Sequence, residues 1–288
     1  MDTNEFWTLG GDLKLNRMGF GAMRLPARDR GGPATDPDVA LAVLRRAVEL
    51  GVDHIDTAAF YFFGDLAANA LISAALQPYR DDLVIATKVG PRRGPGDPMP
   101  TGQMDPGELR AEVERNLREL GLDRLDLVYL RIGGLGTDPS ESLGERFAVL
   151  AGLREEGLIR HLGVSNVTLG QLAEARTIAP VAAVQNRFDV TMPQDAELVR
   201  LCERERIAYV PFFPLGGFGV PSDERLDAVA RRHGATVAQI LLAGLLALSP
   251  VMLAIPGTSS PAHLEENVAA GGLKLSSEDL AVLREISR

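Results

Sequence analysis

Three apolar segments of the chain end in ionisable side chains that could carry out acid–base chemistry. HIDTAAFY contains Asp56 with Tyr61 five residues later, VIATKVG contains Lys88, and LDLVYLR ends at Arg131. A cation at the end of an apolar strand is costly to bury unless it is paired, and Asp56 offers a partner for Lys88. The two residues could form an ion pair that only neutralises itself, or they could belong to an acid–base centre.

An acid–base centre would use the ion pair to adjust Tyr61. A phenol with a pKa of ~10 is a poor proton donor at neutral pH, but a nearby ammonium stabilises the phenolate and lowers that pKa. Tyr61 could then protonate a carbonyl oxygen while a nicotinamide delivers a hydride to the carbon, with Asp56 keeping Lys88 charged and in place. A Schiff-base lyase with Lys88 as nucleophile is an alternative, but Asp56 opposes it by favouring the ammonium.

The elements that must position these residues alternate along the chain. Short β-branched runs predict strands, and stretches with apolar residues at three- and four-residue intervals predict helices between them. We expect strands at 17–23, 52–57, 84–89, 125–130, 159–164, 181–186, 208–213 and 251–255, and helices at 38–50, 65–76, 106–120, 140–156, 169–178, 194–205, 222–233, 236–248 and 261–269. This order favours an α/β fold, a (β/α)8 TIM barrel forming a single domain over residues 1–288, rather than a two-domain doubly wound fold.

Two segments stand outside this repeat, and one loop within it is unusual. FWTLGGDLKL predicts an N-terminal β-hairpin with Gly10, Gly11 and Asp12 at its turn, which could close one mouth of the barrel. SSEDLAVLREIS predicts an extra C-terminal helix with Ser276 or Ser277 as its N-cap. The segment 90–105 is rich in Gly and Pro, so we expect it to lack regular structure and to act as a substrate loop.

Composition excludes several classes of function. The net charge of -9 argues against nucleic-acid and anionic-membrane partners, which need clustered Lys and Arg. The one cysteine, Cys202, cannot form an intramolecular disulfide and is expected to be inert packing, which fits a reducing compartment. No apolar run approaches the ~18 residues of a membrane span, and no signal peptide is evident. We therefore expect a cytoplasmic, monomeric protein without a metal site.

Four motifs in order make the chain similar to the aldo-keto reductase superfamily. HIDTAAFY matches its D-T-A-x-x-Y motif, IATKVG its lysine strand, IRHLGVSNVT its G-V-S-N turn, and IPGTSSPAHLEEN its cofactor motif. YVPFFPLGGF and the LR after the fourth strand resemble, more narrowly, the bacterial pyridoxal reductases. The resemblance implies reduction of a small-molecule carbonyl to an alcohol, such as pyridoxal to pyridoxine, with NADPH becoming NADP+. It implies that Asp56, Tyr61 and Lys88 are catalytic.

The resemblance also implies where the cofactor binds. Ser165, Asn166 and Gln185 would bind the nicotinamide carboxamide, and Phe212 would stack on the ring, where the family usually has a tyrosine. Backbone N–H groups and hydroxyls before the helix at 261–269 suit a phosphate. The remaining implied cofactor contacts are Gly21, Ala22, Met23, Pro214, Leu215, Gly216, Gly217, Ile255, Gly257, Thr258, Ser259, His263, Glu266 and Asn267.

Two features depart from the family pattern. Arg131 stands where the family usually has a histidine, and an arginine stays charged and only donates. It could bind the phenolate of pyridoxal, polarise the carbonyl, or form a structural salt bridge with Asp189. His263 and Gly257 replace an arginine and a lysine of many members, which weakens the discrimination for NADPH over NADH. Because the histidine is missing, a regulatory protein that binds NADPH with little turnover is the alternative function.

Overall fold

A parallel sheet forms the centre of the molecule. The computed structural model describes residues 6–27, 32–134, 140–191, 194–217 and 222–286. The sheet has the order β13-β12-β11-β10-β7-β4-β3, and all its strand pairs are parallel. The strands are β3 (Phe20–Gly21), β4 (His54–Asp56), β7 (Val84–Val89), β10 (Leu125–Arg131), β11 (Ile159–Ser165), β12 (Ala183–Gln185) and β13 (Ala208–Tyr209).

The segment 251–255 closes this sheet into a barrel. Its Leu253 donates to the Tyr209 carbonyl at 2.9 Å on one side, and its Ala254 donates to the Arg17 carbonyl at 2.8 Å on the other. We predicted a strand here, but the segment forms only isolated bridges, at Met252 and Ala254. Prolines 250 and 256 bracket the five residues and lack the N–H that a longer ladder needs. The predicted (β/α)8 barrel is confirmed.

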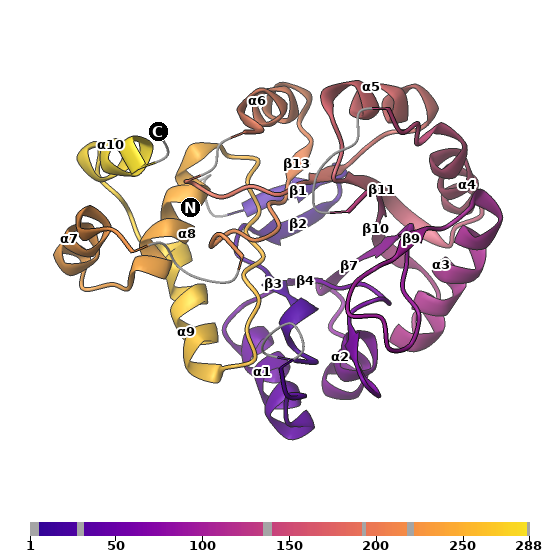
Figure 1. The fold of residues 1–288 in the computed structure, drawn as a ribbon, viewed down its shortest axis with the longest axis horizontal. Helices are drawn as coiled ribbons and strands as arrows, with labels where there is room; N and C mark the ends of the chain where they lie inside the picture. The colour runs from indigo at the N-terminus through magenta and orange to yellow at the C-terminus, as the bar shows by residue number, and fades with distance from the viewer. Residues whose placement is uncertain (1–5, 28–31, 135–139, 192–193, 218–221, 287–288) are drawn as a thin grey trace.

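Helices surround the barrel, as Figure 1 shows. Their apolar spacing explains this, since α1 buries Ala40, Val43, Leu44 and Ala47 along one face. The helices are α1 (Pro37–Glu49), α2 (Ala68–Leu76), α3 (Pro106–Leu120), α4 (Gly144–Glu155), α5 (Leu169–Ile178), α6 (Ala196–Glu205), α7 (Glu224–His233), α8 (Val237–Leu248), α9 (Pro261–Ala269) and α10 (Ser277–Ile286), with 3-10 turns η1 (Ala22–Arg24) and η2 (Ala270–Gly272). Within the described residues, no helix is long and apolar enough to cross a bilayer.

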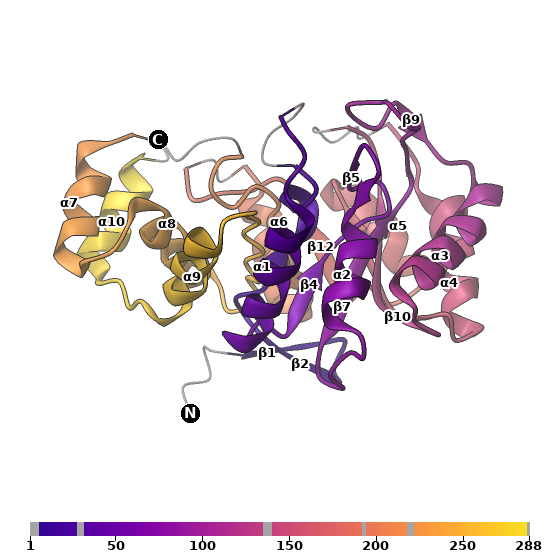
Figure 2. The same ribbon diagram turned by 90° about the horizontal axis from the view of Figure 1, so that it is seen from below.

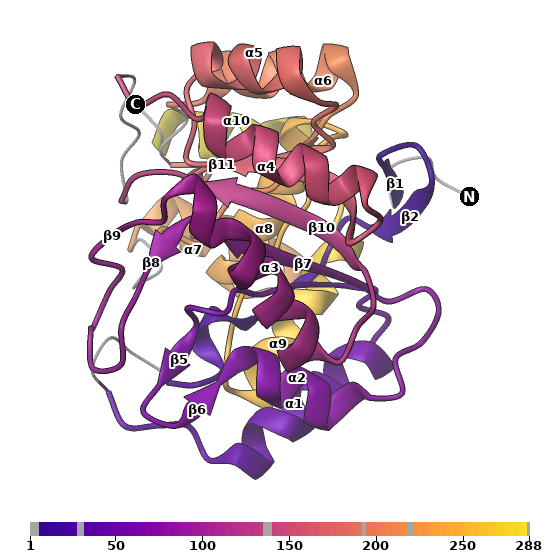
Figure 3. The same cartoon turned by 90° about the vertical axis from the view of Figure 1, so that its right-hand side faces the viewer.

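The two ends of the barrel carry different additions. The predicted N-terminal hairpin is confirmed as β1 (Phe6–Leu9) paired with β2 (Leu13–Asn16), and Figure 2 shows it below the strands. Its side chains Leu9 and Leu15 are buried. Two short hairpins lie at the opposite end in Figure 3, namely β5 (Phe62–Phe63) with β6 (Leu66–Ala67) and β8 (Pro91–Arg92) with β9 (Gly102–Gln103). The hairpin β1–β2 therefore closes the end away from these loops.

The hairpins correct two expectations. The segment 90–105 was expected to lack regular structure, but Thr101 donates to the Arg92 carbonyl at 2.9 Å and Met104 donates to the Gly90 carbonyl at 2.6 Å. A ladder this short needs only a few residues, so the Gly and Pro content between them does not prevent it. The helix expected from residue 65 begins at 68, because β5 and β6 occupy residues 62–67.

The predicted C-terminal helix is also confirmed, as α10. Ser276 is its cap, because the Ser276 hydroxyl accepts from the Asp279 N–H at 3.1 Å and the Asp279 carboxylate accepts from the Ser276 N–H at 2.9 Å. Asp279 also accepts hydrogen bonds from Arg232 and His233, which connects α10 to α7. Burial alone would raise the pKa of Asp279, but these hydrogen bonds hold it well below its usual range.

A buried arginine holds the seam where the barrel closes. Arg17 is 6% exposed and donates to the carbonyls of Met252 at 3.1 Å, Leu246 at 2.5 Å and Ser249 at 2.5 Å. These carbonyls belong to α8 and to the segment that follows it. One side chain therefore joins the segment before β3 to α8 and to the segment that closes the barrel.

We predict that Arg17→Met destabilises the fold. An orphaned buried acceptor costs about 1–3 kcal/mol, so losing three donors should lower the free energy of unfolding by about 3 kcal/mol or more. The denaturant midpoint should fall with its slope unchanged. Arg45→Met is the control, because Arg45 is exposed and should matter by only about 0.5 kcal/mol. Equal, small losses in both variants would contradict this role.

Candidate active site

The ionisable residues predicted from the sequence meet at one end of the barrel. Asp56 ends β4, Lys88 lies one residue before the end of β7, and Arg131 ends β10. Ser165 ends β11 and Gln185 ends β12. Because parallel strands present their carboxyl ends at the same mouth of the barrel, residues far apart in sequence become neighbours.

Lys88 and Asp56 form a buried ion pair. Lys88 Nζ lies 2.5 Å from Asp56 Oδ1 and donates to the Thr57 carbonyl at 3.1 Å. The second carboxylate oxygen, Asp56 Oδ2, accepts from Gln185 Nε2 at 2.7 Å. Lys88 is 1% exposed and Asp56 is 4% exposed. Both oxygens of the carboxylate therefore have partners, which is the condition under which a buried pair is tolerated.

Tyr61 lies against this pair on the loop after β4. Lys88 Nζ is 4.8 Å from the centroid of the Tyr61 ring, which is partly exposed. The Tyr61 N–H donates to the Ala58 carbonyl at 2.9 Å, and its carbonyl accepts from the Ala68 N–H at 2.9 Å. An edge-on contact with Phe60, 5.1 Å between centroids, packs one side of the ring. The Tyr61 ring thus lies next to a buried ammonium and is itself partly exposed.

Arg131 lies beside the pair, in contact with two residues predicted to bind the cofactor. It donates to Ser165 Oγ at 3.0 Å and to the Gly134 carbonyl at 2.7 Å, and its guanidinium lies 4.6 Å from the Phe212 ring centroid. Burial lowers the pKa of Arg131, and the charges of Tyr61 and Asp56 oppose that shift. Arg131 therefore adds a second cation near the phenol.

The salt bridge considered between Arg131 and Asp189 is not formed. Asp189 instead accepts hydrogen bonds from Thr191, from its N–H at 2.8 Å and its hydroxyl at 2.5 Å.

One buried group near the pair, Tyr129, was not predicted from the sequence. Burial raises the pKa of Tyr129, and the neighbouring charge of Asp56 raises it further. Its position two residues before Arg131 on β10 could have indicated it, because alternate residues share a face of a strand. Gln185 Oε1 is buried and has no hydrogen-bond partner among the described residues. The site thus contains an unused acceptor beside the Asp56 carboxylate.

The segments predicted to bind the cofactor converge beside this pair. The Gly21 N–H donates to the Pro256 carbonyl at 3.3 Å, and a Cβ on Gly21 would lie 2.6 Å from the Ile255 carbonyl oxygen. Arg24, next to Ala22 and Met23 in η1, donates to the Gly217 carbonyl at 2.5 Å. Three separate loops, near residues 21, 217 and 255, therefore come together. The backbone at Gly21 and Gly257 approaches too closely for a side chain.

The remaining predicted residues lie on two turns and on the helix α9. In the first, Phe213 has a left-handed backbone, and the Gly216 N–H donates to its carbonyl at 2.9 Å, so Pro214 and Leu215 lie within a tight turn. In the second, Ser260 caps α9 by accepting from the His263 N–H at 3.4 Å. Thr258, Ser259 and Asn267 are buried there, while His263 is exposed and Glu266 is partly exposed.

Asn166 is predicted to bind the nicotinamide carboxamide, but its side-chain amide donates to two backbone carbonyls of this chain. Its Nδ2 donates to the Ile132 carbonyl at 2.9 Å and to the Gly134 carbonyl at 3.3 Å, and its backbone is left-handed with φ of 64°. The amide of Asn166 therefore fixes the loop after β10, the same loop whose Gly134 carbonyl accepts from Arg131. Its predicted contact with the cofactor stays a prediction.

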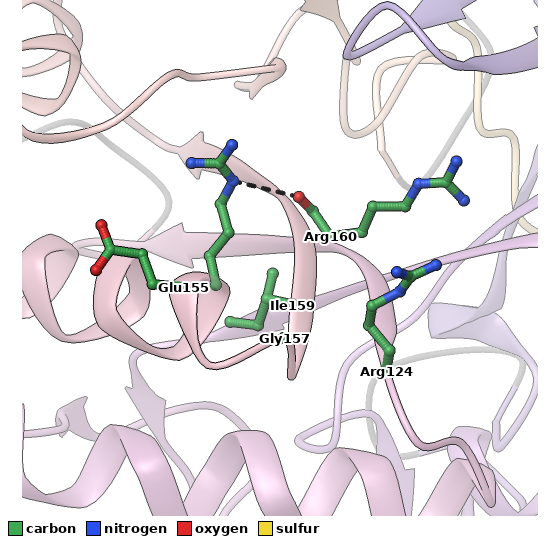
Figure 4. A pocket seen from close by; sticks show the side chains of 6 residues that line it. Arg124, Glu155, Gly157, Ile159 and Arg160 are labelled. Atoms are coloured by element: carbon green, nitrogen blue, oxygen red, sulfur yellow. Dashed lines mark hydrogen bonds between the residues drawn. The ribbon is translucent and has the colours of Figure 1, made fainter.

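A surface pocket lies away from this chemistry. About 320 Å³ in volume, it is lined by Arg124, Arg154, Glu155, Gly157, Ile159 and Arg160, at the amino ends of β10 and β11. Figure 4 shows the Arg124 and Arg160 side chains on one side and Glu155 directed away from them. Arg160 is paired with Asp12 at 2.7 Å, and Arg154 donates to the Arg160 carbonyl at 3.3 Å. Its lining combines three arginines with one carboxylate, Glu155, and includes none of the ionisable residues predicted from the sequence.

Comparisons with known proteins agree with this geometry. Residues 17–288 match the model of the Aldo/keto reductase family. The pyridoxine 4-dehydrogenase of Escherichia coli strain K12 is 48% identical over 290 residues, covering 100% of both chains. A thermostable aldo-keto reductase in complex with the inhibitor epalrestat superposes with a TM-score of 0.83 at 28% identity, covering 98% of this chain and 99% of that one. An aldo-keto reductase from Klebsiella pneumoniae in complex with NADPH gives 0.80 at 25% identity, covering 98% and 94%. The chain therefore belongs to the aldo/keto reductase family.

Proposed function

We propose that this oxidoreductase reduces an aldehyde to an alcohol with NADPH, and that pyridoxal is a substrate. The observation that carries the proposal is the buried Lys88–Asp56 pair with the Tyr61 ring against it, at 2.5 Å and 4.8 Å respectively. If the ion pair were purely structural, there would be no reason for a phenol to lie beside it at the end of the barrel where the strands finish.

Each residue of the centre has a separate task. Bound NADPH supplies a hydride to the carbonyl carbon. Tyr61 donates its proton to the carbonyl oxygen, so that the carbonyl becomes an alcohol and the phenol becomes a phenolate. The Lys88 ammonium stabilises that phenolate, and solvent then restores the proton. Asp56 keeps Lys88 charged and fixed, because the carboxylate favours the ammonium over the free amine.

Residues of the site fit a nicotinamide. A carboxamide has two N–H donors and one acceptor, and Gln185 Oε1 is a buried acceptor without a partner in the described part of the chain. Ser165 Oγ, which lies at the end of the neighbouring strand, can donate to the carboxamide oxygen. The close backbone approach at Gly21 and Gly257 brings two of the segments predicted to bind the cofactor together beside Asp56. NADPH rather than NADH is supported by the relative from Klebsiella pneumoniae, whose structure contains it.

Pyridoxal is supported by one relative and by Arg131. The Escherichia coli protein, 48% identical over its whole length, is a pyridoxine 4-dehydrogenase. Pyridoxal has an acidic hydroxyl next to its aldehyde, and a guanidinium binds a phenolate oxygen well. The charges of Arg131 and Tyr61 interact, so the two side chains are close. Arg131 can therefore bind the phenolate oxygen of pyridoxal while Tyr61 donates its proton to the aldehyde oxygen.

The direct test is NADPH oxidation, followed by absorbance, with pyridoxal and with pyridine-4-carbaldehyde, which lacks the hydroxyl. We expect turnover of both, with the higher kcat/KM for pyridoxal, and a lower kcat/KM with NADH in place of NADPH. Turnover of the simple aldehyde alone would keep the reductase and reject pyridoxal. Tight NADPH binding without turnover of any carbonyl would favour the regulatory alternative.

We predict that Tyr61→Phe binds NADPH normally but loses most turnover. The variant keeps the ring against Lys88 and removes only the proton, and general acid catalysis typically contributes about 10²–10⁴-fold. NADPH binding is measured by fluorescence titration, and kcat by NADPH oxidation. Full activity in the variant would show that another group donates the proton. Tyr79→Phe is the control, because Tyr79 donates to the Leu120 carbonyl at 2.7 Å, away from the site.

We predict that Arg131→Met impairs pyridoxal more than pyridine-4-carbaldehyde. Hydrogen bonds to charged groups contribute about 1.5–3 kcal/mol, which corresponds to roughly a 10- to 100-fold loss in kcat/KM for pyridoxal. The simple aldehyde should change by roughly threefold or less. Losses of the same size for both aldehydes would mean that Arg131 does not bind the hydroxyl of pyridoxal.

A further inference from the structure

A second set of polar side chains lies directly behind the Lys88–Asp56 pair, on the outer side of the barrel wall. Thr57 and Thr87 follow and precede the two charged residues, and Asn69 and Asn116 come from α2 and α3. The four side chains are 0%, 0%, 1% and 0% exposed, respectively. A strand–helix interface is ordinarily filled by apolar side chains, so four buried polar groups need a specific reason.

The four side chains form one continuous chain of hydrogen bonds. The Thr57 hydroxyl donates to Asn69 Oδ1 at 2.8 Å, and Asn69 Nδ2 donates to Asn116 Oδ1 at 3.1 Å. The Thr87 hydroxyl donates to the same Asn116 Oδ1 at 2.7 Å. Asn116 Nδ2 donates to the Glu112 carbonyl at 2.9 Å. We call Thr57, Asn69, Thr87 and Asn116 the outer network.

The direction of these hydrogen bonds is fixed by a carboxylate. Asn69 Nδ2 also donates to Glu119 Oε2 at 2.9 Å, and an ionised carboxylate can only accept. The amide nitrogen of Asn69 must therefore face Glu119, which turns its oxygen toward the Thr57 hydroxyl. Arg115 in turn donates to Glu119 Oε1 at 2.7 Å.

The outer network and the ion pair meet at the Thr57 backbone. The Thr57 carbonyl accepts from Lys88 Nζ at 3.1 Å, and its N–H donates to the Ala86 carbonyl at 2.8 Å. Successive residues of a strand point to opposite faces, so Asp56 and Lys88 point into the barrel while Thr57 and Thr87 point outward. Asp56 and Lys88 are therefore each next in sequence to a threonine whose hydroxyl is held by the outer network.

We propose that the outer network positions the Lys88–Asp56 pair against Tyr61, so that Asn69 and Asn116 are positioning residues for catalysis. The inference rests on the function proposed above. Hydrogen bonds are directional, whereas apolar packing tolerates small shifts, and misplacement of a catalytic group by about 1 Å can cost roughly 10²-fold in rate. The network sets the orientation of the Thr57 carbonyl, and that carbonyl sets where the ammonium lies.

The test removes one hydroxyl without changing its shape. Thr57→Val should lower kcat about tenfold with Kd for NADPH unchanged, and Thr57→Ser should restore most of kcat. With NADPH deuterated at the transferred position, the isotope effect on kcat should rise in Thr57→Val because hydride transfer becomes slower. Ser249→Ala, which loses a partly buried hydrogen bond to Glu203 at the other end of the barrel, should leave kcat and the isotope effect unchanged.

If Thr57→Val kept the same isotope effect and only the fraction of molecules that bind NADPH fell, the proposal would be overturned. That result would show that the network only supports folding. If Thr57→Val does not fold, Thr87→Val carries the same test from the neighbouring strand. A lack of turnover in the unaltered protein would count against the proposed function instead, and the two failures are therefore distinct.

A second measurement needs no substrate. The chain has three lysines, Lys14, Lys88 and Lys274, so a nitrogen-15 lysine spectrum is simple. The buried Lys88 ammonium should give a slowly exchanging signal, identified by its loss in Lys88→Arg. Exchange should be at least severalfold faster in Thr57→Val and unchanged in Ser249→Ala. Identical exchange in both variants would overturn the positioning role.

Discussion

The burial of a lysine and an aspartate inside the barrel is the constraint on which the rest of the site depends. Removing two charges from water costs several kcal/mol for each ion unless the geometry between them is excellent. The register of β4 and β7 provides that geometry, because Asp56 lies opposite Ala86 and Lys88 follows two residues later on the same face. The small Ala86 side chain leaves room for Lys88 to reach back to Asp56. Gln185 and the Thr57 carbonyl complete the hydrogen bonds of the pair.

The buried Lys88–Asp56 pair also explains why the two ends of the barrel differ. Below the pair, Leu9 and Leu15 from the N-terminal hairpin are buried, and that end is closed. Above it lie the loops that carry Tyr61, Phe212 and the glycines, and the Tyr61 ring there is partly exposed. Water that reached the pair from below would weaken the attraction between its charges, because that attraction falls as the effective dielectric constant rises. The hairpin thus contributes to the chemistry although none of its side chains reaches a reacting atom.

Much of this arrangement could be predicted from sequence, for identifiable reasons. Asp56, Lys88 and Arg131 interrupt apolar runs, and a charge at the end of a buried strand has few explanations. The short pairings β5–β6 and β8–β9 could not be predicted, because a ladder of two residues leaves no periodicity to detect. The outer network was equally hidden. Asn69 and Asn116 are 47 residues apart, and each resembles an ordinary polar residue of an amphipathic helix until the barrel brings them together.

Arg131 limits which residue can donate a proton in the proposed mechanism. A histidine at its position could exchange a proton with the substrate, but an arginine stays charged at neutral pH. In the proposed mechanism Arg131 is therefore not the acid, and the proton comes from Tyr61. Its hydrogen bond to Ser165 and its contact with Phe212 place a fixed positive charge between the residues expected to hold the nicotinamide and the phenol. A fixed charge there favours electron density that develops on a carbonyl oxygen, and it favours most a substrate with an anionic oxygen beside that carbonyl.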